Sequence, residues 1–195
     1  MQIDVVVPDG VSGPWKVETF TISEQESNTS KLRALITGNP GIYVPAGTYK
    51  RLTCLGEVVM SNTLMEVNTN MEFINRATGR VLINGLGLGM VLTEILKKDS
   101  VESVTVVERS QDVINLTAPS FAHDPRVKIV HSCAFEYTPE DGEVFDVAWH
   151  DIWTYISPDN LDEMLKLENK LRPYVKGYQG SWAKTECIRM SRRGR

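Results

Sequence analysis

The chain has few cysteines and no long apolar run. Its 195 residues include only Cys54, Cys133 and Cys187, an odd number without a CxxC pair, so we expect neither a disulfide framework nor a zinc ribbon. It has no run of about 18 apolar residues, which predicts that no segment spans a membrane. The start, MQIDVVVPDG, lacks the basic stretch and long apolar core of a signal peptide. We therefore expect a cytoplasmic protein.

Neither sign of charge dominates. There are 21 Lys and Arg against 25 Asp and Glu, a formal net charge of −4, which argues against bulk nucleic-acid binding but not against a small nucleotide ligand. His123, His131 and His150 lack the i, i+4 spacing of a helical metal site, so we expect no metal. A content of 42% hydrophobic and 24% charged residues is that of an ordinary globular domain.

Residues 1–63 form a β-rich region, which we expect to serve as a lid or a dimer contact. β-Branched stretches alternate there with turn-forming residues such as DGVSGP at 9–14. The expected elements are strands at 3–8 and 15–22, a helix at 24–36 ended by Gly38, and a hairpin over 43–60 with turns at Gly47 and Gly56.

Strand and helix patterns alternate through most of residues 64–195, which predicts βαβ units and a parallel sheet. The fold class is thus α/β, a doubly wound, mostly parallel Rossmann-like sheet with a small β-rich N-terminal extension. The expected strands are 81–85, 103–108, 127–131 and 145–151, with a fifth in 177–182; the expected helices are 64–77, 87–98, 110–118 and 157–172, the last with Ser157 as N-cap and Pro158 in its first turn. The basic tail 190–195 is expected to fray.

A glycine loop joins the first of these strands to its helix. Gly85, Gly87 and Gly89 permit a tight turn and let a ligand approach the backbone, close to the free N–H groups of the helix. About 20 residues later Glu108 ends the next strand, where nucleotide-binding folds place a carboxylate for the ribose hydroxyls. The alternative is a structural turn and a surface glutamate.

The loop does not match the phosphate-binding motifs. A dinucleotide fingerprint needs glycine at position 90, where this chain has Met90, and no Gly-Lys-Ser/Thr phosphate loop is present. The spacing suits a ligand without phosphate that lies across the strand tips.

Four segments carry a family resemblance: VLINGLGLGMVLTEIL, VTVVERSQDVINL, VKIVHSCAFEY and FDVAWHDIW. Over roughly residues 60–155 the chain resembles the class I S-adenosylmethionine-dependent methyltransferase fold, and within it the spermidine-synthase-like branch. The resemblance implies S-adenosylmethionine, or its decarboxylated form, as cofactor. The implied cofactor contacts are Gly85, Leu86, Gly87 and Gly89 under the methionine and ribose, Glu108 and Arg109 near the ribose, Cys133 and Ala134 at the adenine, and Asp151.

The same resemblance places the catalytic aspartate of aminopropyltransferases at Asp151. An aspartate at a strand tip could accept a proton from a nucleophile. Because neighbouring strand residues point to opposite faces, only one of His150 and Asp151 should enter the site, and we favour Asp151. The alternatives are a turn-capping Asp151 and a buried His150. The candidate substrate contacts are Asn62, Thr63, Glu66 and Asn70 on the lid side, with His150, Trp153 and Tyr155 near the strand tip, although the aromatic residues could instead be core.

Several positions depart from the family pattern. Ile83 stands where an acid is usual, Cys133 replaces a common aspartate, and residues 151–155 read Asp-Ile-Trp-Thr-Tyr instead of Asp-Ser-Ser-Asp-Pro. No Asn/Asp-Pro-Pro-Tyr motif is present, and the Rossmann-like part is short at its C-terminal end.

Three functions therefore remain open. They are a methyltransferase of unknown acceptor, a spermidine-synthase-like aminopropyltransferase, and a non-catalytic cofactor-binding protein. Each predicts a small-molecule ligand, and the resemblance suggests a homodimer.

Overall fold

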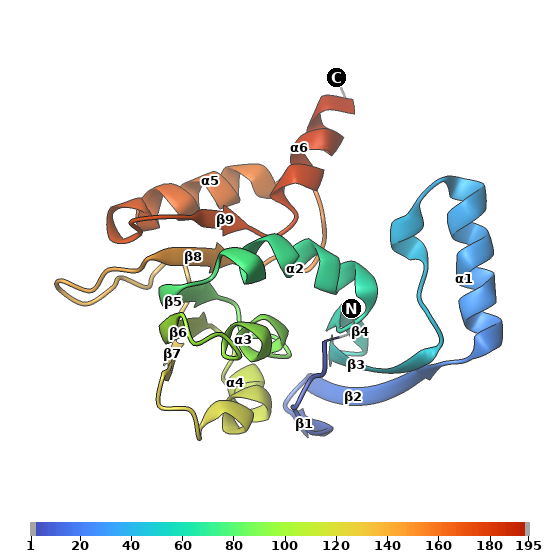
Figure 1. Cartoon of the computed structure of the whole chain (residues 1–195), viewed down its shortest axis with the longest axis horizontal. Helices are drawn as coiled ribbons and strands as arrows, with labels where there is room; N and C mark the ends of the chain where they lie inside the picture. The colour runs from blue at the N-terminus through green and yellow to red at the C-terminus, as the bar shows by residue number, and fades with distance from the viewer. Residues whose placement is uncertain (1–2, 194–195) are drawn as a thin grey trace.

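The computed structural model describes residues 3–193 and contains two sheets. Five parallel strands in the order β7-β6-β5-β8-β9 form the larger sheet, and four antiparallel strands in the order β1-β2-β3-β4 form the N-terminal sheet (Figure 1). The predicted doubly wound α/β class with a β-rich extension is confirmed. The parallel sheet comprises β5 (Gly79–Asn84), β6 (Val101–Glu108), β7 (Val127–His131), β8 (Val147–His150) and β9 (Gln179–Ser181).

The parallel sheet separates two hydrophobic clusters, because successive side chains along its strands point to opposite faces and both faces are apolar. Val81, Ile83 and Trp149 point into a cluster with helices α2 (Leu64–Arg76), α3 (Met90–Ile95) and α4 (Gln111–Thr117). Leu82 and Ala148 point into the other, with helix α5 (Asn160–Leu171). A strand buried on both faces reads as a continuous apolar run, which is why VLING was recognisable from sequence.

The N-terminal sheet is built from β1 (Gly10–Ser12), β2 (Trp15–Ile22), β3 (Gly47–Cys54) and β4 (Glu57–Ser61). The predicted strand at 3–8 is wrong: this segment is irregular, although it buries Ile3 and Val7 in the main core. Pro8 has no N–H for a ladder. The predicted turn at 9–14 also contains β1, which pairs with β2.

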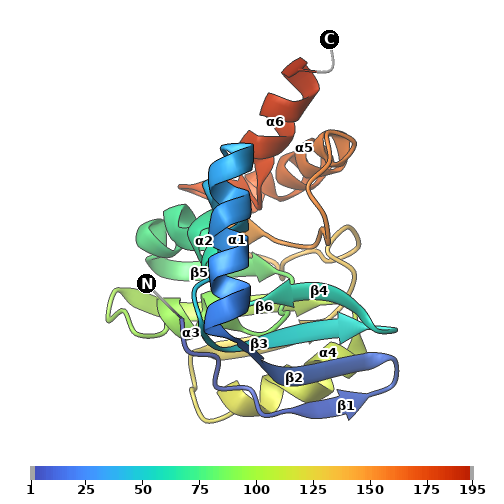
Figure 2. The same ribbon diagram turned by 90° about the vertical axis from the view of Figure 1, so that its right-hand side faces the viewer.

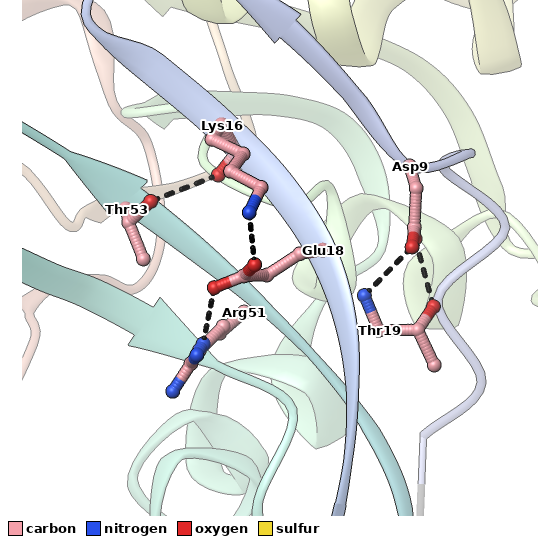
Figure 3. A network of polar contacts seen from close by, with 6 residues as sticks. All are labelled: Asp9, Lys16, Glu18, Thr19, Arg51 and Thr53. Atoms are coloured by element: carbon pink, nitrogen blue, oxygen red, sulfur yellow. Dashed lines mark hydrogen bonds and ion pairs between the residues drawn. The ribbon is translucent and has the colours of Figure 1, made fainter. Parts of the chain in front are cut away.

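The predicted hairpin is present, but only one of its two turns was placed correctly. Leu55 and Gly56 have positive φ (52° and 87°) and connect β3 to β4, as a tight hairpin turn requires. Gly47 begins β3 instead of forming a turn. A polar network crosses the outer face of this sheet (Figure 3), with Arg51 Nε 2.7 Å from Glu18 Oε1 between adjacent strands.

Helix α1 (Glu24–Thr37) follows the prediction for residues 24–36. Ser23 and Glu26 form a reciprocal capping box, and Gly38 ends the helix with φ 63°. The helix stands away from the parallel sheet in Figure 1, and it lies nearest the viewer in Figure 2.

Helix α5 begins later than expected. The N-cap is Asp159, not Ser157, because the Ser157 hydroxyl accepts the N–H of Asp159 in a turn that contains Pro158. The tail predicted to fray continues α6 (Lys184–Arg193) as far as residue 193; residues 194–195 lie outside the described part. Across residues 3–193, no helix combines the length and apolarity needed to cross a membrane.

Candidate functional site

A cavity lies at the carboxyl ends of the parallel strands, the edge at which open α/β sheets bind ligands. The parallel sheet provides the glycine loop after β5 and the ends of β6, β7 and β8, while the N-terminal sheet provides a wall that includes Trp15 and Met60. That this sheet serves as a lid or as a dimer contact stays a prediction.

The glycines of the loop are required by close contacts within the protein. Gly85, Gly87 and Gly89 have φ of 100°, 50° and 67°, a region that side chains other than glycine rarely adopt. A Cβ on Gly85 would lie 2.0 Å from the Asp151 carbonyl oxygen, and one on Gly87 would lie 2.2 Å from Met60 Sδ. The loop therefore fits tightly against the β8 tip and against β4.

Glu108 joins the loop to the next strand end. One carboxylate oxygen accepts the N–H of Leu86 (2.9 Å) and the other accepts the N–H of Ser110 (2.8 Å). A carboxylate has about four acceptor positions, so two remain for hydroxyl donors. Since Glu108 and Arg109 both line the cavity, the predicted ribose position is available to a ligand.

The predicted adenine-side residues also border the cavity. Cys133 and Ala134 follow β7 and line it together with Phe135. The Cys133 carbonyl accepts the N–H groups of Glu136 and Tyr137 at 2.9 and 2.8 Å, which fixes the turn that presents these side chains. The Cys133 thiol is only a weak hydrogen-bond acceptor.

Two carboxyl groups enter the cavity from opposite elements. Asp151 follows β8, and Glu66 lies in the first turn of α2. Burial raises the pKa of Asp151 to about 7, and burial together with the charge of Asp151 raises that of Glu66 to about 8. Each group is therefore able to take up a proton near neutral pH.

His150 does not line the cavity. It is fully buried, with Nδ1 2.7 Å from Asn84 Nδ2 and Nε2 2.9 Å from Gln179 Nε2. Burial is the main cause that lowers its pKa to about 3, with a smaller effect of Lys184, so the ring is neutral at pH 7. The buried Asn84 Oδ1 has no partner in the described chain, and a half-turn of the amide would let it accept from Nδ1–H.

Four other predicted substrate contacts lie outside the lining. Asn62 bonds to the backbone of Ile3 and Lys50, Thr63 bonds to Ser61, and Asn70 is fully buried. Tyr155 is 66% exposed. Trp153, by contrast, lines the cavity, while its indole N–H donates to Glu163. Of the predicted substrate contacts, the structure brings Glu66 and Trp153 to the cavity. All the predicted cofactor residues line it as well, except Gly89, which packs on Phe121.

Sequence reasoning missed most of the apolar wall. Trp15, Met60 and Trp182 come from segments far from the glycine loop along the chain. Their spacing carries no signal of a shared site, because only the packing of the two sheets brings them together. Within the described residues, no group of three metal-binding side chains could hold an ion.

Comparison with known proteins identifies the fold. No protein-family model matches the sequence, and no curated protein does. Among solved structures, spermidine synthase from Thermotoga maritima aligns with TM-score 0.53 and 21% identity, over 93% of this chain and 57% of that one. A spermidine synthase in complex with the transition-state analogue AdoDATO gives the same values.

An N-methyltransferase, NodS from Bradyrhizobium japonicum in complex with S-adenosyl-L-homocysteine, aligns with TM-score 0.46 and 12% identity, over 63% of this chain and 67% of that one. The chain spans less than two thirds of the length of the spermidine synthases that it matches. The fold is methyltransferase-like, of the kind that spermidine synthase also has.

Proposed function

We propose that the chain binds S-adenosylmethionine, or its decarboxylated form, and transfers an alkyl group from the sulfonium to an amine. The observation that carries this proposal is the meeting of the glycine loop, Glu108 and Asp151 in one cavity. The donor set fits an adenosyl ligand: a carboxylate with free acceptor positions suits a ribose diol, and apolar side chains near Cys133 and Ala134 suit a purine.

When bound, the sulfonium would supply an electrophilic carbon whose bond to sulfur breaks as the nucleophile attacks. Asp151 would hold the amine at the strand tip and accept the proton that the nitrogen must lose. Its raised pKa makes it a stronger base than an ordinary aspartate. Such a reaction depends mainly on alignment, which the tight packing of Gly85 on the Asp151 backbone would maintain.

Methyl and aminopropyl transfer are the two candidate reactions. The acidic residues of the cavity suit a cationic amine acceptor, which either reaction can use. The missing Asp-Ser-Ser-Asp-Pro run argues against aminopropyl transfer. The alignment with spermidine synthase favours that reaction, because it includes nearly the whole chain and therefore the N-terminal sheet. We retain methyl transfer as the main proposal and aminopropyl transfer as the second.

The test is a transfer assay with each sulfonium and a panel of primary and secondary amines, read by chromatography of the nucleoside products. S-Adenosylhomocysteine would identify methyl transfer and methylthioadenosine aminopropyl transfer. Asp151→Asn should abolish turnover while it keeps sulfonium affinity. Binding without turnover of any amine would instead support a non-catalytic cofactor-binding protein.

A further inference from the structure

We propose that Glu66 is a second proton-handling residue of this site, paired with Asp151, so that the two carboxyl groups share one proton and together receive the ammonium group of the acceptor. The inference rests on the proposed transfer to an amine. It assigns to Glu66 a role in catalysis and a reason for its position.

The first turn of α2 is fixed by side chains that converge on Glu66. Its backbone carbonyl accepts hydrogen bonds from Thr69 Oγ1 (2.8 Å) and Asn70 Nδ2 (3.0 Å). Each of these residues is in turn held by a tryptophan: Trp182 Nε1 donates to Thr69 Oγ1 and Trp149 Nε1 donates to Asn70 Oδ1, both at 2.9 Å. Two indole groups therefore anchor this turn.

The two tryptophans lie on or next to the strands at the Asp151 side of the cavity. Trp149 lies on β8 two residues before Asp151. Trp182 directly follows β9, and its backbone N–H donates to the carbonyl of His150. Phe73 of α2 stacks on Trp149 with ring centroids 5.2 Å apart. Helix α2 and the β8 tip are thus one packed unit, which holds Glu66 and Asp151 in the same cavity.

The carboxyl groups themselves have few partners. Glu66 Oε1 accepts one N–H, from Ser61 at 3.3 Å, and the Asp151 carboxyl accepts no hydrogen bond within the described residues. The other charged groups that line the cavity are Glu108 and Arg109 at the end of β6. The pair is partly buried in a cavity that four tryptophans also line, so two negative charges are disfavoured there.

With one proton shared between Glu66 and Asp151, the protons and charges of the transfer balance. An acceptor enters as an ammonium ion and is held by the single negative charge of the pair. One N–H proton passes to the carboxylate, and the freed lone pair forms the new N–C bond as the C–S bond breaks and its electrons return to sulfur. The pair, then fully protonated, returns the extra proton to solvent.

The first experiment follows the carboxyl carbons of Glu66 and Asp151 by NMR as pH is varied in the protein without ligand. Both should titrate above their ordinary range, and Asp151→Asn should lower the pKa of Glu66 because it removes a neighbouring negative charge. A Glu66 carboxyl that titrates near its ordinary value, unchanged by Asp151→Asn, would overturn the inference.

The second experiment measures the pH dependence of amine turnover. In Glu66→Gln, kcat/KM for the amine should fall about 10- to 100-fold, with a shifted pH profile and unchanged sulfonium affinity. Trp182→Phe removes the indole N–H and should reproduce part of this loss. Glu72→Gln is the matched control, because Glu72 lies on α2 but is exposed and pairs with Arg76.

The outcomes separate the two proposals. Turnover in the wild type with an unaltered pH profile in Glu66→Gln would overturn the pair and leave the proposed function standing. Coupled titration of the carboxyl groups without any sulfonium binding would overturn the proposed function, and with it the catalytic role of Glu66.

Discussion

Met60 and Leu88 connect the two sheets at the glycine loop: the backbone N–H of Leu88 donates to Met60 Sδ over 3.2 Å. Met60 lies on β4 and Leu88 between Gly87 and Gly89, so a thioether of the N-terminal sheet rests on the loop that would bind the cofactor. We therefore expect a substitution at Met60 or in the loop to change both the stability of the protein and its ligand binding.

Gly87→Ala should destabilise the protein and weaken ligand binding. The added methyl would lie 2.2 Å from Met60 Sδ, at a residue with φ of 50°, and we expect a loss of about 1–3 kcal/mol in the free energy of unfolding. Denaturant unfolding provides the measurement.

A double variant separates the two causes. Met60→Ala should recover part of the loss in the Gly87→Ala background, because it removes the clash but not the backbone strain. Strictly additive effects of the two substitutions would contradict the contact between Met60 and the loop.

His150 should make stability fall as pH falls. Its pKa is lowered to about 3 in the folded protein, so below about pH 6.5 the unfolded chain binds a proton that the folded one does not. Relative to His150→Gln, we expect the wild type to lose about 2 kcal/mol of unfolding free energy between about pH 7.5 and pH 5.

The comparison uses unfolding curves of both proteins across this range. Subtracting the unfolding free energy of the variant from that of the wild type removes the contribution of Glu66 and Asp151. These two carboxyl groups make stability fall as pH rises, which is the opposite of the effect of His150. Parallel curves would show that His150 titrates normally and is not buried as a neutral ring.

Asp151→Asn should stabilise the protein at alkaline pH. Because the folded pKa of Asp151 is raised to about 7, the folded state holds a proton between about pH 4 and 7 that the unfolded state has lost, and stability falls as pH rises through that range. The neutral amide avoids this loss, so the variant should exceed the wild type by about 1–3 kcal/mol near pH 8 and match it near pH 4.

Thermal unfolding at several pH values provides the check, with Asp159→Asn as a control in the exposed turn before α5. An equal change of stability at every pH would mean that Asp151 is not buried as a protonated acid.

The parallel sheet could be predicted from sequence because its signals are local. The run VLING, the glycines after it and Glu108 at the end of β6 each have a meaning within about 25 residues of chain, and the structure places them together as expected. Alternation along β8 likewise indicated that His150 and Asp151 point to different sides.

The rest of the site depends on long-range packing. Nothing near Met60 in the sequence indicates that it meets Gly87, and the role of Asn70 as an anchor for Trp149 follows only from the docking of α2 on β8. The wrong prediction for residues 3–8 has the same cause. Their β-branched composition predicts a strand, but no neighbouring strand pairs with them.

Cofactor binding at the glycine loop is measured by calorimetric titration of the wild type and Glu108→Gln with S-adenosylmethionine, its decarboxylated form and S-adenosylhomocysteine. We expect the wild type to bind at least one sulfonium and Glu108→Gln to bind it about 10-fold or more weakly, since a charged hydrogen bond contributes roughly 1.5–3 kcal/mol. Absence of heat with all three ligands, together with an unchanged melting temperature, would contradict this expectation and make the glycine loop purely structural.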